Sequence, residues 1–76
     1  MKDLIAFIAT RLVDDPDAVN TIQREEDGTV TVELRVAKDD LGKVIGKQGR
    51  TARAMRAVLA AVSATEDKRS RLEILE

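Results

Sequence analysis

Residues 30–36 alternate strictly between apolar and polar side chains, and this pattern limits the fold more than any other feature of the sequence. The apolar members are Val30, Val32, Leu34 and Val36. Successive side chains of a β-strand point to opposite faces, so the segment predicts a strand with one buried and one solvated face. One strand cannot bury its apolar face alone, so further strands must extend it and helices must cover it.

Two elements are predicted before this strand. Residues 19–24 read as another strand, and Asp27-Gly28 supplies the turn chemistry that joins antiparallel partners in a hairpin. Residues 2–13 place apolar side chains at helical spacing, which predicts an amphipathic helix that Asp14, Asp15 and Pro16 end. The side chains expected on its buried face are Leu4, Ile5, Ile8 and Leu12, with Phe7 at the edge of the core.

Three more elements are predicted after the strand. Residues 41–45 form a short helix, which Asp39 or Asp40 can cap and Gly46 interrupts. Residues 50–64 form a longer helix with Ala52, Met55, Leu59 and Val62 at core spacing, and residues 71–75 form a last strand with Leu72 and Ile74 inward. The fold class is therefore α+β in the order αββααβ. We expect one domain over residues 1–76, with a three-stranded sheet and three helices packed on one of its faces.

The side-chain inventory excludes most catalytic chemistry. The chain has no Cys, His, Trp or Tyr, so it lacks thiol nucleophiles, the usual neutral-pH base and the usual zinc ligands. We therefore expect that the chain is not an enzyme and that it binds neither a cofactor nor a metal ion. The apolar residues near the start are too few and too interrupted to form a signal peptide or a membrane span, which favours a cytoplasmic protein.

Positive charge is concentrated in one segment. Residues 41–65 contain Lys43, Lys47, Arg50, Arg53 and Arg56 and no acid, although the whole chain has a net charge of −1. An acidic body with one basic segment is typical of a local phosphate-binding face, although an ordinary helix with a charged side gives the same pattern.

Two glycines bracket two polar residues where the predicted helices meet, in Gly46-Lys47-Gln48-Gly49. A Gly-x-x-Gly pattern alone also fits a plain turn between helices. Here it follows Val44-Ile45 and precedes the basic helix. Missing side chains would let a nucleic-acid backbone approach the loop's N–H groups, and the positive end of the following helix dipole points to the same place.

In this setting the chain resembles a type II KH domain. Over its full length, and most clearly in residues 43–54, it is similar to the stand-alone bacterial KH-domain proteins of the KhpA (YlqC) family. The resemblance implies a shallow apolar groove for single-stranded RNA beside the loop. The RNA-binding residues that it implies are Gly42, Lys43, Ile45, Gly46, Lys47, Gln48, Gly49, Arg50 and Arg53. Arg56 is more distant, and Val36 is a candidate for the second wall; both Val36 and Ile45 also fit a core position.

The longer helix carries a second feature, a strip of small residues that faces away from its core side. The strip consists of Ala54, Ala57 and Ala61, bordered by Val58. It suggests close packing with another helix, although the helix propensity of alanine explains it equally well. The family resemblance implies a homodimer or pairing with a second KH-containing RNA-binding protein.

The leading hypothesis is a non-catalytic protein that grips single-stranded RNA. The resemblance extends this to post-transcriptional regulation or RNA chaperoning, linked to growth, division and cell shape. The alternative is a dimerising protein-protein adaptor for which RNA binding is secondary. A helix-turn-helix DNA-binding protein is disfavoured because it would leave the sheet and the glycine loop without a role.

Overall fold

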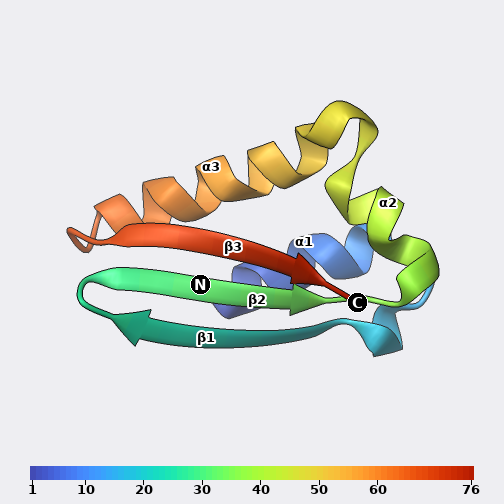
Figure 1. The fold of residues 1–76 in the computed structure, drawn as a ribbon, viewed down its shortest axis with the longest axis horizontal. Helices are drawn as coiled ribbons and strands as arrows, with labels where there is room; N and C mark the ends of the chain where they lie inside the picture. Colours follow the sequence, from blue (N-terminus) through green and yellow to red (C-terminus); the bar gives the residue numbers. More distant parts are fainter.

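A central strand organises the sheet in the computed structural model, which describes residues 1–76 (Figure 1). The strands are β1 (Asn20–Glu26), β2 (Thr29–Arg35) and β3 (Arg69–Leu75), and the helices are α1 (Lys2–Leu12), α2 (Leu41–Ile45) and α3 (Arg50–Ala64). One-turn 3-10 helices cover Pro16–Ala18, Lys38–Asp40 and Lys47–Gly49. The predicted order of elements and the α+β class are confirmed.

The sheet has the order β1-β2-β3 and mixes two directions. Strand β1 is antiparallel to β2, and β3 is parallel to it. Asp27 and Gly28 have φ values of 51° and 75°, which are the positive values that a tight hairpin turn requires, so the predicted turn is confirmed. Strand β3 begins at Arg69, two residues earlier than predicted, because the Arg69 N–H donates to the Gly28 carbonyl.

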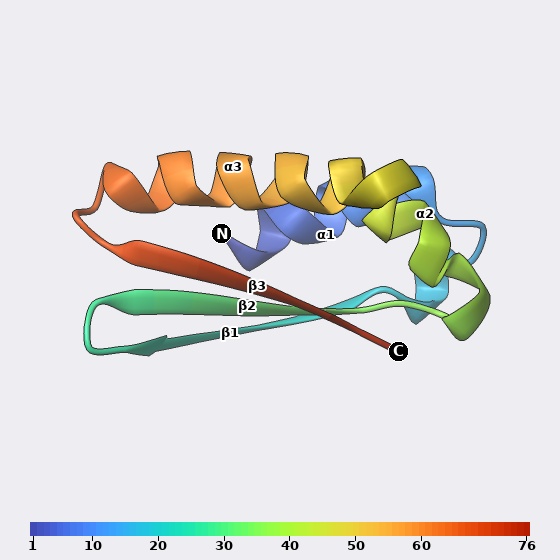
Figure 2. The ribbon, with the colours of Figure 1, turned by 45° about the horizontal axis from the view of Figure 1, so that its top comes forward.

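The alternating strand forms the middle of the core, as predicted. Val30, Val32 and Leu34 are fully buried, and they pack with side chains from all three helices, including Ile5, Val44, Met55 and Leu59. Figure 2 shows the helices together on one side of the sheet. The opposite face of the sheet is polar, and Arg24 pairs across it with Glu33 at 2.7 Å and Glu73 at 3.3 Å.

Helix α1 buries a narrower stripe than its sequence predicts. Only Ile5 and Ala9 are buried, whereas Leu4 and Leu12 are exposed, which corrects the expected face. Phe7 was expected at the edge of the core, but it is 56 % exposed and the Arg11 guanidinium lies 4.5 Å from the centre of its ring. The reason is that α1 packs against the sheet along one line and no further layer covers its outer side.

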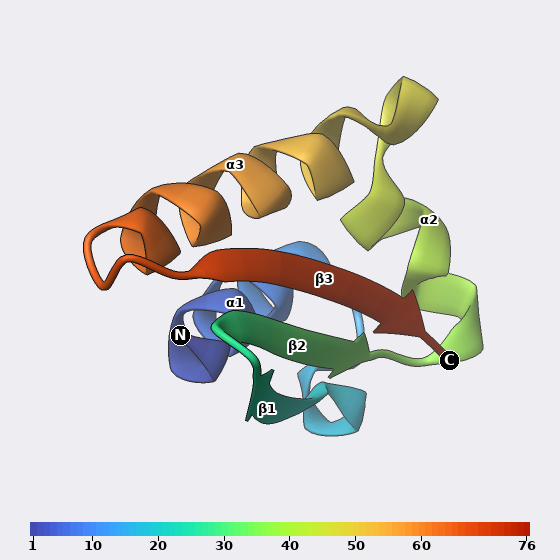
Figure 3. The same ribbon diagram turned by 60° about the vertical axis from the view of Figure 1, so that its left-hand side comes forward.

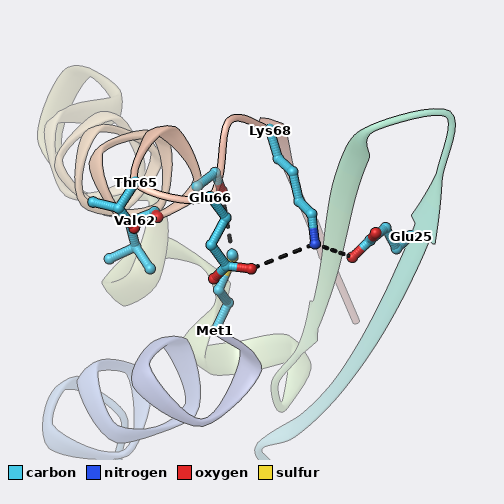
Figure 4. A network of polar contacts seen from close by, with 7 residues as sticks. Met1, Glu25, Val62, Thr65, Glu66 and Lys68 are labelled. Carbon is cyan, nitrogen blue, oxygen red and sulfur yellow. Dashed lines mark hydrogen bonds and ion pairs between the residues drawn. The ribbon is translucent and has the colours of Figure 1, made fainter.

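The end of α3 also departs from the prediction. Ser63 is fully buried, and Val62 is only half-buried. The Ser63 hydroxyl donates to the Met1 sulfur at 3.3 Å, which gives this buried polar group a partner and joins the start of α1 to the end of α3. In the turn that follows, Lys68 lies between Glu25 of β1 at 2.8 Å and Glu66 at 3.4 Å (Figure 4).

Candidate nucleic-acid interface

The loop between α2 and α3 has a backbone that only glycine adopts easily. Gly46 has φ 78° and ψ 171°, in a region that side chains exclude, and Gly49 lies in the left-handed region at φ 73°. Gln48 is also left-handed, at φ 58°, although it carries a side chain. The two polar residues therefore project from a bend that the glycines make possible.

The first turn of α3 packs against this bend and forms hydrogen bonds with it. A Cβ atom on Gly46 would overlap the Thr51 hydroxyl and would lie 2.8 Å from the Thr51 Cβ and 2.9 Å from its backbone nitrogen. Arg53 donates from Nη2 to the Gln48 carbonyl oxygen at 2.7 Å, and Arg50 donates from Nη2 to the Gln48 side-chain oxygen at 3.1 Å. The loop and the start of the helix thus form one unit.

The outer side of the loop offers unused hydrogen-bond donors. Within the loop, the Gly46 N–H donates to the Gly42 carbonyl at 2.9 Å and the Gly49 N–H to the Gly46 carbonyl at 3.1 Å. The N–H groups of Lys47 and Gln48 donate to no other residue, and the Lys47 ammonium makes no ion pair. Two free amides beside a free cation are suited to a phosphate group.

Helix α2 presents different residues on its two sides. Lys43 and Ile45 are two positions apart, so they lie about 160° apart around the helix. Ile45 is exposed, and neighbouring Gly42 has open space where a side chain would stand. The sequence allowed Ile45 and Val36 to be either core or groove residues. Ile45 lies at the surface and is 41 % exposed, whereas Val36 is 4 % exposed and belongs to the core.

Lys43 faces the other way, toward two carboxylates. Its ammonium lies 2.8 Å from Asp14 and 3.5 Å from Asp40. The hydrogen bond to Asp14 raises the pKa of Lys43 above its usual value. The structure therefore separates Lys43 from the other basic residues near the loop and joins it to the segment that follows α1.

Asp40 was expected as a possible helix cap, but its carboxylate does not cap α2. The side chain is buried, and its Oδ2 accepts a hydrogen bond from the Asp15 N–H at 3.1 Å. Burial alone would raise the pKa of Asp40, but the N–H groups of Asp15 and Asp14 and the charge of Lys43 together lower it. Asp40 thus fixes the approach to α2.

A groove runs between α3 and the free edge of β3, which Figure 3 shows lying alongside each other. It has a volume of about 390 Å³ and is lined by Arg56, Leu59, Ala60, Ser70, Arg71 and Leu72. Strand β3 has a partner on one side only. In a parallel pair of strands, alternate residues form backbone hydrogen bonds with the partner strand. Arg69 and Leu75 form such bonds on the β2 side. The backbone groups of Ser70, Leu72 and Ile74 therefore point outward, away from β2.

The side of α3 that borders this groove is basic at its start. Arg53, Arg56 and Ala60 have the spacing of one helix face. Arg56 donates to the Leu72 carbonyl at 3.5 Å, so its guanidinium reaches the edge of β3. The sequence pattern placed Arg56 farther from the loop than the other basic residues and did not identify β3 as a wall of the groove. The strand edge that lies beside α3 depends on strand order, which no local motif encodes.

The other exposed side of α3 carries the small-residue strip. Ala54, Ala57 and Ala61 are exposed on the side of the helix that faces away from Met55 and Leu59, and Val58, which is also exposed, borders them. The structure holds no cluster of three or more side chains suited to a metal ion, and none of its helices has the length and apolar character needed to cross a membrane.

A family of known proteins matches nearly the whole chain. The family model described as "KhpA/KhpB, KH domain" matches residues 2–74. The chain belongs to this KH-domain family. Because the KhpA/KhpB family is not a family of enzymes, the prediction that the chain has no catalytic activity is confirmed.

Several relatives are similar over the full length of the chain. A protein of Aquifex aeolicus is 50 % identical over 76 residues, covering all of this chain and 96 % of its own. A protein of Halalkalibacterium halodurans is 46 % identical, covering both chains completely, and one of Bacillus subtilis is 45 % identical, covering all of this chain and 94 % of its own. Each of these relatives is named RNA-binding protein KhpA.

Proposed function

We propose that the chain binds single-stranded RNA by holding one stretch of the backbone against the loop at residues 46–49. The unused N–H groups of Lys47 and Gln48, next to the unpaired Lys47 ammonium, carry this proposal. Arg50, Arg53 and the positive end of the α3 dipole lie at the same place. The names of the full-length relatives support RNA as the ligand.

The bases would then lie in the groove between α3 and β3. Leu59, Ala60 and Leu72 supply apolar contact, and the outward backbone groups of Ser70 and Ile74 can bond base edges. A groove of this kind accommodates about four nucleotides. Ring stacking has no part in it, because the one aromatic residue, Phe7, lies on α1 and not in the groove.

The salt dependence follows from the number of phosphates that are neutralised. If two or three phosphates are contacted, the logarithm of the binding constant falls against the logarithm of salt concentration with a slope of about −1.4 to −2.1. Binding by one copy is expected to be weak and to have broad sequence preference.

The test is the double substitution Lys47→Asp/Gln48→Asp. Two carboxylates repel phosphate, while the exposed turn stays folded because Asp tolerates the left-handed conformation of Gln48. The control, Asn20→Asp/Lys38→Asp, makes the same change in net charge at exposed residues outside the loop and the groove. Short single-stranded RNA should bind the control as it binds the native protein and should not bind the loop variant. Equal binding by both variants would refute the grip.

A second candidate function is an adaptor that associates through Ala54, Ala57, Val58 and Ala61. The observation in its favour is that the strip, including Val58, is exposed and uncharged. Two copies, or a copy with another KH protein, would bring two grooves together and raise the apparent affinity through effective concentration. Under this hypothesis Ala61→Arg abolishes assembly and function, and the loop variant keeps both.

Roles in post-transcriptional regulation or RNA chaperoning would follow from the same binding step. Crosslinking in cells and sequencing of the bound RNA, with the Lys47→Asp/Gln48→Asp variant as the control, tests these roles. Recovery of the same RNAs with both proteins would favour the adaptor.

A further inference from the structure

The Gln48 carbonyl oxygen accepts one short hydrogen bond from a side chain outside the loop. Arg53 Nη2 lies 2.7 Å from the Gln48 carbonyl oxygen, a distance typical of a charge-assisted hydrogen bond. Arg53 makes no ion pair with any carboxylate. Its one directed contact in the folded chain is therefore with the loop backbone.

The backbone conformation of Gln48 explains why this contact matters. Its φ of 58° is a conformation that residues with a side chain adopt rarely, and the backbone bonds that hold the loop are donated by the N–H groups of Gly46, Gly49 and Arg50. The Gln48 carbonyl takes part in none of these backbone bonds. Arg53 therefore adds a side-chain bond to a turn that the backbone bonds close, and without it we expect the Gln48 peptide and the N–H groups of Lys47 and Gln48 to be held less firmly in their common direction.

We propose that Arg53 is a positioning residue for RNA binding, which acts through the Gln48 carbonyl and not by neutralising a phosphate. The inference rests on the proposed function, because it assigns Arg53 a role within the same grip. Holding the loop in its bound conformation before RNA arrives removes an ordering cost from binding.

The two roles differ in their dependence on salt. A side chain that neutralises one phosphate of a single strand contributes about 0.7 to the slope of the logarithm of affinity against that of salt concentration. A positioning residue changes affinity and leaves this slope unchanged. It also changes the order of the loop in the absence of RNA, which a phosphate contact does not.

The experiment compares Arg53→Ala with Arg56→Ala and Lys47→Ala. Arg56 is the matched control for free-state loop order, because it lies on the same face of α3 and loses the same charge but touches Leu72 instead of the loop. Lys47→Ala marks the slope change that a phosphate contact produces. Affinity for a short single-stranded RNA is measured at several salt concentrations, and the order of the Gln48 and Gly49 amides is measured by 15N relaxation in the free proteins.

We expect Arg53→Ala to bind about five- to tenfold more weakly with an unchanged slope, and to show lower order at Gln48 and Gly49. Arg56→Ala should keep that order. A slope that becomes shallower by about 0.7 in Arg53→Ala, or unchanged order at Gln48, would overturn the positioning role. Failure of the RNA grip itself is seen separately, as a native protein whose Lys47 and Gln48 amides do not respond to RNA.

Discussion

Replacing Gly46 by alanine tests whether the bend before α3 depends on a missing side chain. The φ and ψ values of Gly46 lie in a region that non-glycine residues occupy only at a cost of about 1–3 kcal/mol. The new methyl group would also meet the Thr51 hydroxyl, Cβ and backbone nitrogen. Forcing atoms into such a space costs a further 1–3 kcal/mol, roughly. The total is about 2–6 kcal/mol, a large part of the stability of a small domain.

Two other glycines provide the controls. Gly49 has a left-handed φ but open space around a Cβ, so Gly49→Ala should cost about 1–2 kcal/mol. Gly42 lies in α2 with open space and no positive φ, so Gly42→Ala should stabilise by about 0.5–1 kcal/mol.

Urea unfolding followed by far-UV circular dichroism measures all three free energies of unfolding. The expected order of stability is Gly42→Ala, native, Gly49→Ala, Gly46→Ala. The backbone nitrogen of Thr51 contributes to the overlap, so adding Thr51→Ala should not rescue Gly46→Ala. A Gly46→Ala protein as stable as Gly42→Ala would refute the steric reasoning.

Two further predictions concern the buried carboxylate and the core. The pKa of Asp40 is below its ordinary 3.8, so its stabilisation is complete above that pH and is lost as the pH falls through the lowered pKa. Asp40→Asn should therefore lower the melting temperature near neutral pH and flatten its fall in acid; parallel acid profiles for both proteins would contradict this. Leu34→Ala removes a fully buried side chain of β2 and should cost about 2–5 kcal/mol in urea unfolding, whereas Leu4→Ala, on the exposed side of α1, should cost much less.

The fold could be predicted from local patterns wherever one face of an element is buried. The alternation in β2 predicts only a strand with one buried face, and Asp27-Gly28 predicts only a hairpin turn. Both predictions are confirmed. The pattern misled at α1, where four apolar side chains suggested a broad buried face. Burial there depends on how many layers cover the helix, which the spacing within the helix does not encode.

The candidate site was predictable in part for the same reason. Local sequence marks the glycine loop, because positive φ values have a distinctive residue requirement. The groove against β3 was not predictable, since it forms between residues ten to sixteen positions apart and uses backbone groups that leave no trace in composition. The Lys43 ion pairs with Asp14 and Asp40 were missed because they also depend on tertiary packing.

The position of β3 has a consequence for synthesis of the protein. The glycine loop is complete when α3 has formed, but the groove exists only after residues 69–75 have crossed back to pair with β2. That pairing joins segments about forty residues apart, so it carries a loop-closure cost before its contacts form. Under the proposed mode of RNA binding, a ribosome-bound chain halted before β3 would expose the loop's amides to phosphate but would offer no surface on which to read a base.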